Sequence, residues 1–155
     1  MFKWFGIVSF TPHTKVAAFA EHLKDGRIVG SRCTACGERS FPPRADCERC
    51  LSPAFEFVPI APRGRLLTWT RIHAAPTGFE ALAPYALGVV DLEDGGRALA
   101  SFGSSVTPDL IRIGMELDLV PRLHEEIEDI RVDYTLERPG AGSGAAAGTA
   151  PPGRR

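Results

Sequence analysis

The sequence predicts a mainly β protein with one N-terminal helix, a four-cysteine ribbon and a five-stranded barrel. Glycine and proline are frequent, with 16 and 13 copies in 155 residues, which favours short strands and tight turns over a helical bundle. All four cysteines lie in one short stretch, and five β-rich segments follow it. A content of 44% hydrophobic and 24% charged residues excludes a wholly disordered or collagen-like chain.

Residues 1–26 are expected to form an N-terminal arm and a helix. Thr11 is placed to cap the helix, and Pro12 suits its first position. One apolar face recurs at helical spacing: Val16, Phe19, Ala20 and Leu23. Gly26 is placed to end the helix in a left-handed conformation. The aromatic-rich residues 4–10 fit either a strand or an apolar docking arm, or they cover the protein's own core.

Residues 27–60 are expected to form a zinc ribbon of the rubredoxin-like type. The segment holds two Cys-x-x-Cys pairs separated by ten residues: Cys33, Cys36, Cys47 and Cys50. Two such pairs can close a tetrahedron of sulfurs around Zn²⁺ with Zn–S bonds of about 2.3 Å. The ten-residue connector is long enough to run out and back as a small hairpin. Four thiolates fill the zinc shell, so we expect a structural Zn²⁺ and no catalytic one.

Other uses of the four cysteines fit less well. Disulfides are disfavoured in a reducing cytosol, and a redox dithiol needs one pair instead of two. Iron or an iron–sulfur cluster could occupy the same sulfurs. Four thiolates on a dication leave a charge of −2. Nearby arginines either offset this charge or face outward to an anionic ligand or partner: Arg32, Arg39, Arg44 and Arg49.

Residues 61–138 are expected to form a closed five-stranded barrel of the OB-fold type. Five segments have β-rich or alternating composition: residues 65–73, 85–92, 97–102, 115–120 and 130–136. The sequence Glu-Asp-Gly-Gly at residues 93–96 predicts a tight hairpin between the second and third of these. Residues 139–155 contain no large apolar side chain, so we expect a flexible tail.

Taken in order, these motifs resemble one particular family. They are GRIVGSRCTACG at 26–37, FPPR at 41–44, CERC at 47–50, RGRLLTWT at 63–70 and IGM at 113–115. The chain is similar to the zinc-ribbon/OB-fold proteins associated with acyl-CoA enzymes, over about residues 11–134. The segment before Thr11 and the alanine- and glycine-rich tail depart from the family pattern.

The resemblance implies a non-catalytic accessory subunit in a hetero-oligomer. Members of the family partner thiolases or thiolase-like enzymes, and they help to bind CoA or shape the acyl pocket. The small subunit of an aromatic acyl-CoA thiolase, such as benzoylsuccinyl-CoA thiolase, is the nearest type. The alternatives are an accessory subunit of a hotdog-fold enoyl-CoA hydratase or of an aldolase.

The residue inventory also favours a chain with no catalytic residues of its own. A thiolase needs a cysteine nucleophile, and all four cysteines here are assigned to the metal. No Gly-x-Ser-x-Gly motif occurs, and the sequence after His124 lacks the second histidine of a zinc-protease motif. The histidines are scattered and fit surface or packed positions better than catalytic ones: His13, His22, His73 and His124.

Basic residues in the first half of the chain are candidates for CoA phosphates. Arg63 and Arg65 flank a glycine at the first barrel strand, and Arg44 ends the Phe-Pro-Pro-Arg turn. Arginine binds phosphate in a bidentate manner, although these three could equally bind carboxylates within the fold.

An OB-fold nucleic-acid-binding protein is the alternative from another functional class. Such binding needs a basic track with stacking aromatics. Residues 72–137 instead carry four arginines against thirteen acidic residues, so nucleic acid ranks well behind an enzyme partner. No stretch approaches the roughly 18–20 apolar residues of a membrane span, and the first ten residues lack the features of a secretory signal. We therefore expect a cytoplasmic protein with no membrane partner.

Overall fold

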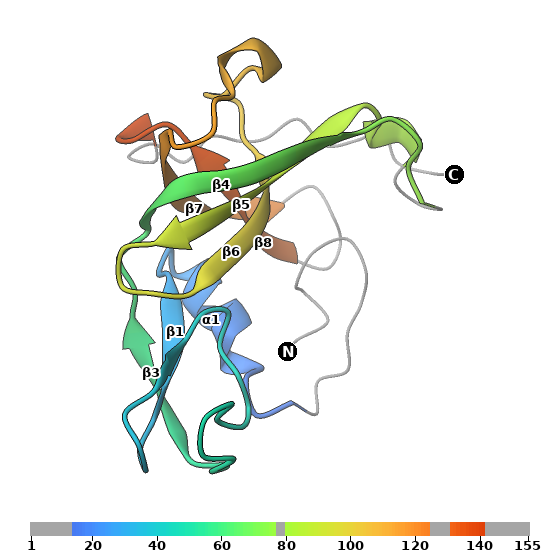
Figure 1. Cartoon of the computed structure of the whole chain (residues 1–155). Helices are drawn as coiled ribbons and strands as arrows, with labels where there is room; N and C mark the ends of the chain where they lie inside the picture. The colour runs from blue at the N-terminus through green and yellow to red at the C-terminus, as the bar shows by residue number, and fades with distance from the viewer. Residues whose placement is uncertain (1–13, 77–79, 125–130, 142–155) are drawn as a thin grey trace, which may run out of the picture.

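The computed structural model describes residues 14–76, 80–124 and 131–141. One helix and a three-stranded ribbon lie at one end of the molecule, and a five-stranded barrel lies at the other (Figure 1). The order is α1 (Ala18–Lys24), β1 (Val29–Cys33), β2 (Arg39–Ser40), β3 (Phe55–Pro59), β4 (Arg63–Ile72), η2 (Glu80–Leu82), β5 (Tyr85–Leu92), β6 (Arg97–Phe102), η3 (Pro108–Leu110), β7 (Glu116–His124) and β8 (Arg131–Glu137). The predicted mainly β fold is confirmed.

Helix α1 is shorter than the sequence predicts. It begins at Ala18, after a turn in which the Ala17 N–H donates to the Thr14 carbonyl, so the start predicted near Thr11 was too early. Thr11, Pro12 and residues 4–10 lie outside the described residues. Three members of the predicted apolar face are buried in α1: Phe19, Ala20 and Leu23.

The end of α1 follows the sequence prediction. Gly26 has φ +74°, and its N–H donates to the Leu23 carbonyl while the Arg27 N–H donates to the His22 carbonyl. This pair of hydrogen bonds satisfies the last carbonyls of the helix and requires a left-handed residue, which glycine adopts without strain.

The ribbon sheet has the strand order β2-β1-β3, with both pairs antiparallel. Ser31 lies at its centre, opposite Ser40 on one side and Phe57 on the other. The connector between the cysteine pairs does not form the hairpin that its length allows. Its first part, β2, pairs back on β1, and residues 41–46 contain no strand.

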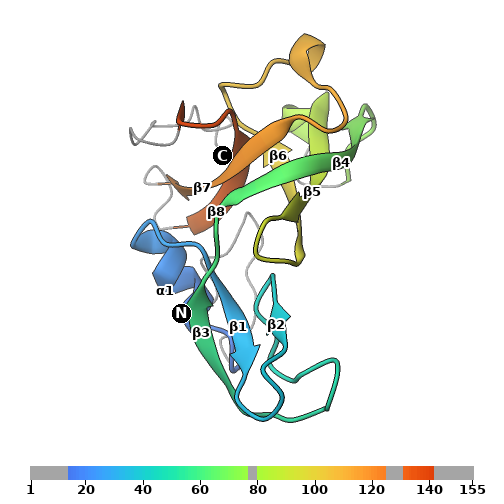
Figure 2. The same ribbon diagram turned by 60° about the vertical axis from the view of Figure 1, so that its left-hand side comes forward.

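The barrel closes in the order β4-β5-β6-β8-β7, as in an OB-fold (Figure 2). Four neighbouring pairs are antiparallel, and the fifth, β6 with β8, is parallel and joins only Ser101 to Thr135 and Phe102 to Leu136. All five predicted strands are present. β4 starts slightly earlier than predicted, and β7 continues further, to His124.

A single apolar core joins helix, ribbon and barrel. The barrel interior is filled by aliphatic side chains with at most 2% exposure: Leu66, Val90, Leu117, Leu119, Val132 and Leu136. Three rings link the parts, Phe19 of α1, Phe41 of the ribbon connector and Tyr134 of β8, with centroids 5.9–6.3 Å apart. Gly96 lies against Phe41, where a Cβ atom would come within 3.0 Å of the Phe41 Cβ. The ribbon and the barrel are therefore packed together through side chains of both.

Within the described residues, no helix has the length and apolar character needed to cross a bilayer.

Candidate functional site

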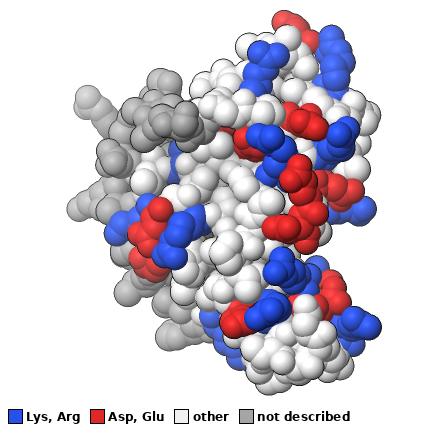
Figure 3. Space-filling view, turned by 90° about the vertical axis from the view of Figure 1, so that its left-hand side faces the viewer, with Lys and Arg blue, Asp and Glu red and all other residues white. Residues whose placement is uncertain are grey.

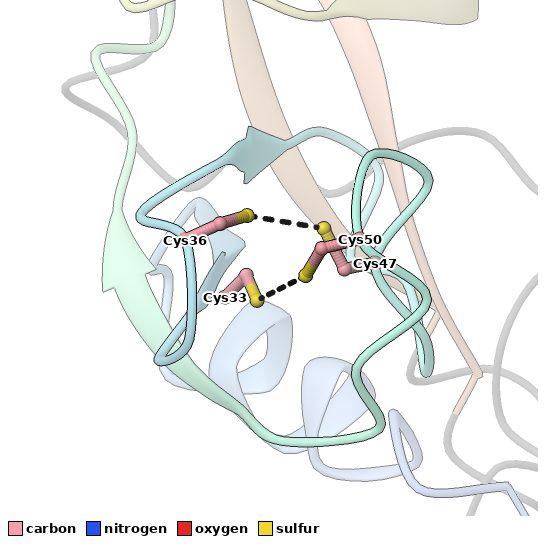
Figure 4. Close-up of side chains that lie close together, drawn as sticks. All are labelled: Cys33, Cys36, Cys47 and Cys50. Atoms are coloured by element: carbon pink, nitrogen blue, oxygen red, sulfur yellow. Dashed lines mark hydrogen bonds between the residues drawn. The ribbon is translucent and has the colours of Figure 1, made fainter.

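The four cysteines converge in the ribbon, with their sulfurs turned toward one another (Figure 4). Cys33 ends β1 and Cys36 lies in the following turn, whereas Cys47 and Cys50 lie in the loop before β3. All four sulfurs are within 4.8 Å of one another. Two separations each join one sulfur of each pair, 3.6 Å for Cys33–Cys50 and 3.5 Å for Cys36–Cys47.

The two cysteine turns have the same backbone structure. We call residues 33–38 the first knuckle and residues 47–52 the second knuckle. In each, the N–H of the fifth residue donates to the carbonyl of the first at 2.9 Å. The N–H of the first residue also donates to the carbonyl of the sixth, at 2.8 Å in the first knuckle and 3.0 Å in the second. The ribbon therefore presents its sulfurs from two equivalent turns.

The fifth residue of each knuckle has a left-handed backbone. It is Gly37 in the first, with φ +78°, and Leu51 in the second, with φ +59°. Leucine is disfavoured in this conformation, and the Leu51 side chain is 80% exposed, so it packs against little else. Aligning the two Cys-x-x-Cys motifs places Leu51 opposite Gly37, and this alignment would have indicated its left-handed backbone from the sequence.

Backbone amides face the sulfurs and change their acidity. Hydrogen bonds from the Cys36 and Ala35 amides lower the pKa of Cys33 to about 6, although burial opposes them. At Cys36 the Glu38 amide acts in the same direction, but burial and the three other sulfurs outweigh it and raise the pKa to about 12. A cation next to the Cys36 sulfur would favour its thiolate and so oppose this rise in pKa.

The donor set fits a tetrahedral metal ion. Sulfurs at the corners of a tetrahedron with Zn–S bonds of about 2.3 Å are about 3.8 Å apart, close to the two separations measured. Separations of 3.5 and 3.6 Å are far longer than the roughly 2.05 Å of a disulfide bond. The four cysteines are thus placed to bind one metal ion.

Most arginines of the ribbon have carboxylate partners. Arg32 pairs with Glu56, Arg44 with Glu48, and Arg49 with Glu38 at 3.5 Å. No carboxylate partner of Arg39 occurs among the residues that the structure describes. The contacts therefore favour a role in balancing charge within the fold over a role in binding an anionic partner.

Comparison with known proteins agrees with this architecture. Residues 20–56 match the family described as "ChsH2, rubredoxin-like zinc ribbon domain", and residues 57–122 match "ChsH2, C-terminal OB-fold domain". A "DUF35 domain-containing scaffold protein" of Pyrococcus furiosus is 34% identical over 116 residues, which cover 74% of this chain and 84% of the relative. The chain belongs to the DUF35 family.

Two further relatives of this DUF35 chain have names that mention enzymes. "Benzoylsuccinyl-CoA thiolase subunit BbsA" of Thauera aromatica is 32% identical over 98 residues, which cover 61% of this chain and 65% of the relative. The solved structure titled "Ltp2-ChsH2(DUF35) aldolase" contains a chain that matches with a TM-score of 0.65 and 28% identity, over 79% of this chain and 93% of that one. These similarities support an accessory subunit in acyl-CoA metabolism.

The arginines considered for CoA lie in two places in this DUF35 chain. Arg63 and Arg65 lie together on β4 and line a hollow of about 370 Å³, whereas Arg44 lies in the ribbon loop. Arg63 contacts Asp118 through two hydrogen bonds of 2.9 and 3.2 Å, and these lower the pKa of Asp118. Arg65 pairs with Glu116 at 3.0 Å. Sequence reasoning missed both carboxylates, because β7 lies more than 50 residues from Arg63 and Arg65.

The described histidines do not form a nucleophile–base pair. In residues 14–76, 80–124 and 131–141, no histidine is hydrogen-bonded to a serine, threonine or cysteine side chain. His22 packs against Phe57, and burial lowers its pKa. His124 lies 3.1 Å from Asp133, which also binds Arg122. His13 lies outside the described residues.

The face drawn in Figure 3 carries no continuous basic track among the described residues. Figure 3 shows one face on which an uncharged strip runs from the barrel above to the ribbon below, bordered by basic and acidic side chains that alternate. A cavity of about 650 Å³ lies at the junction of α1, β3 and β7 and has largely apolar walls, including Ile60, Leu119 and Pro121. Neither feature has the positive charge that a nucleic-acid backbone needs.

Proposed function

We propose that this chain is the non-catalytic, zinc-binding subunit of an acyl-CoA-metabolising complex, with a thiolase or thiolase-like enzyme as its partner. The arrangement of the four sulfurs on the ribbon of a DUF35 fold carries the proposal. All cysteine sulfurs lie in one cage, so the chain has no cysteine left to act as a thiolase nucleophile. The similarities to BbsA and to the Ltp2–ChsH2 aldolase chain support an enzyme partner.

Zn²⁺ is the metal that we propose for the cage formed by Cys33, Cys36, Cys47 and Cys50. Four thiolates in a tetrahedron match its preference, and its role there is structural because no coordination position stays open. The amides that face the sulfurs fix the thiolate orientations from outside the cage. The ribbon of residues 27–60 then acts as a rigid unit attached to the barrel of residues 61–138.

CoA contact through Arg44, Arg63 and Arg65 stays a prediction. Each of the three already has a carboxylate partner, so a CoA phosphate would have to replace an existing ion pair. Arg65 is the most accessible of them, since its side chain is 70% exposed. An Arg65→Ala variant of the assembled complex that raises KM for acyl-CoA, with exposed Arg138→Ala as a control, would support the contact.

Co-purification tests the proposed function. The tagged chain, isolated from its native host, should bring down a thiolase-like subunit identified by mass spectrometry, and one zinc per chain should be found by elemental analysis. The isolated chain should not cleave or hydrate any acyl-CoA, and the partner should need it for full activity. Recovery of a hotdog-fold hydratase subunit instead would favour the alternative partner. Turnover by the isolated chain would contradict the proposal.

A further inference from the structure

Strand β4 has a free edge along half of its length. On one side it pairs with β5 as far as Ile72, opposite Tyr85. On the other side it pairs with β7 only through Arg63–Arg65, and two backbone hydrogen bonds of Leu66 end the contact. Beyond that point no described strand pairs with this side of β4, and the strand continues past the barrel with β5 (Figure 1). We call residues 68–72 on this side the free edge.

Within the described part of the chain, the free edge lacks the features that normally protect an exposed strand. Residues 67–71 are all exposed, and the segment Leu-Thr-Trp-Thr-Arg-Ile consists mostly of residues that favour strands. Proteins usually block such edges with proline, several charges or a covering element. Here one arginine is the only charged residue between positions 66 and 79. The free edge is therefore suited to backbone pairing with another strand.

Two side chains on the free edge are of the types that dominate protein interfaces. Trp69 and Arg71 are two residues apart and lie on the same face of the strand, with Trp69 37% exposed. Arg63 and Arg65, on the same strand, each bind a carboxylate of β7. For Arg71 the described residues supply no carboxylate.

We infer that the free edge of β4 accepts an extended strand of the enzyme subunit, which carries apolar side chains and a carboxylate that binds Arg71. The inference rests on the proposed function for the identity of the partner. A second copy of this chain is a poorer occupant, because residues 66–72 contain no acidic residue to pair with Arg71. Nucleic acid is a poorer occupant too, since a single cation does not neutralise a phosphate backbone.

Hydrogen exchange tests the backbone pairing without altering the chain. Peptides covering residues 66–73 should exchange faster in the isolated protein than peptides from β5. In the complex with the co-purified enzyme subunit they should become protected by at least tenfold. A Trp4→Phe variant leaves Trp69 as the sole tryptophan, and its emission should shift to the blue when the enzyme subunit binds.

Charge reversal tests the side chains. Arg71→Glu should weaken binding of the enzyme subunit by about tenfold or more, as is common for central interface arginines, and Trp69→Ala should do the same. Arg138→Glu is the matched control, because it makes the same charge change at an exposed residue outside β4, and it should bind within twofold of the wild type. Unchanged melting temperatures will show that the variants fold. A Glu→Arg or Asp→Arg change in the enzyme strand should rescue Arg71→Glu.

Three results would overturn the inference, and they differ from one another. In the first, residues 66–73 stay unprotected in the complex and Arg71→Glu binds normally. This result refutes the free edge as the binding site and leaves the proposed function intact. Self-association of the isolated chain that Arg71→Glu abolishes assigns the edge to a second copy. Failure to recover any acyl-CoA enzyme subunit refutes the proposed function and, with it, the enzyme as the source of the strand.

Discussion

The ribbon and the barrel lie in one chain and share a core, yet different forces hold their far ends together. In the barrel, aliphatic side chains such as Leu117 and Leu136 are completely buried, and each stabilises the fold by about 1.5–3 kcal/mol through removal from water. In the first knuckle, residues 34–38 are all exposed or half-buried. That end of the ribbon has no apolar core, and sulfur–metal bonds must take its place.

This difference teaches where each part is vulnerable. The barrel should tolerate loss of the metal, because its core does not extend to the knuckles. The ribbon should tolerate a cavity in the barrel as long as its junction is intact, namely the Phe19, Phe41 and Tyr134 rings. Four substitutions, in order of expected effect, can break or sharpen the comparison.

The largest effect is expected from loss of a sulfur ligand. Cys33→Ser should release the metal and abolish amide protection in the two knuckles and β2, while the barrel strands stay protected, because the knuckles have nothing else to hold them. Hydrogen exchange measures the loss of amide protection, and elemental analysis measures the bound metal. Ala35→Ser, within the same Cys-x-x-Cys, is the control and should keep the metal. Equal loss of protection in the barrel would show that the two parts depend on one stabilising force.

A cavity in the barrel should come next. Leu117→Ala should lower the free energy of unfolding by about 2–5 kcal/mol, as a fully buried leucine does elsewhere, and leave metal binding unchanged. Denaturant titration measures the loss. Leu110→Ala, where the side chain is 41% exposed, should cost much less. Release of the metal from folded Leu117→Ala would contradict the independence of the cage.

The barrel also contains an ion pair that gives it a pH dependence separate from that of the thiolates in the knuckles. Burial acts to raise the pKa of Asp133, but hydrogen bonds from His124 and Arg122 outweigh it, so the pKa lies below its usual value. The ionised form is therefore favoured by folding. This stabilisation is present above the unfolded pKa, which is about 4, and is lost as the pH falls through the folded value.

Replacing this carboxylate tests the contribution. Asp133→Asn should destabilise the protein by about 1–3 kcal/mol at pH 7, and the difference from the wild type should shrink as the pH falls below about 4. Asp91→Asn is the control, because its pair with Arg97 is exposed, and it should change stability by less than about 1 kcal/mol. A constant difference between Asp133→Asn and the wild type from pH 7 to pH 3 would exclude the ionic contribution.

The smallest effect compares the two knuckles with each other. A left-handed backbone costs a leucine about 1–2 kcal/mol, and glycine loses about 0.5–1 kcal/mol more entropy on folding. Leu51→Gly should therefore raise the free energy of unfolding of the metal-bound protein by about 0.5–1 kcal/mol, measured by denaturant titration. Gly37→Ala should lower the free energy of unfolding by about 1 kcal/mol, because the added Cβ has open space around it but the left-handed backbone is strained for alanine. If Leu51→Gly and Gly37→Ala change the free energy of unfolding in the same direction, the two knuckles are not equivalent.

Several features could be predicted because they depend on a few neighbouring residues. The spacing of Cys33 and Cys36 and of Cys47 and Cys50 indicated the cage, and Gly26 indicated the end of α1. The Glu-Asp-Gly-Gly turn indicated the β5–β6 hairpin. The helix start was placed wrongly because a capping threonine and a proline fit many turns, and the helix instead begins at Ala18.

By itself, the sequence determined which segments form the barrel strands, where the chain turns between β5 and β6, and which sulfurs can meet, because backbone preferences and ligand spacing act over a few residues. Only the tertiary structure decided that Arg63 binds Asp118, that β6 meets β8 to close the barrel, and that β4 outruns β7 and leaves an edge free. These outcomes depend on register between strands far apart in the chain, and register is set by how the buried side chains pack.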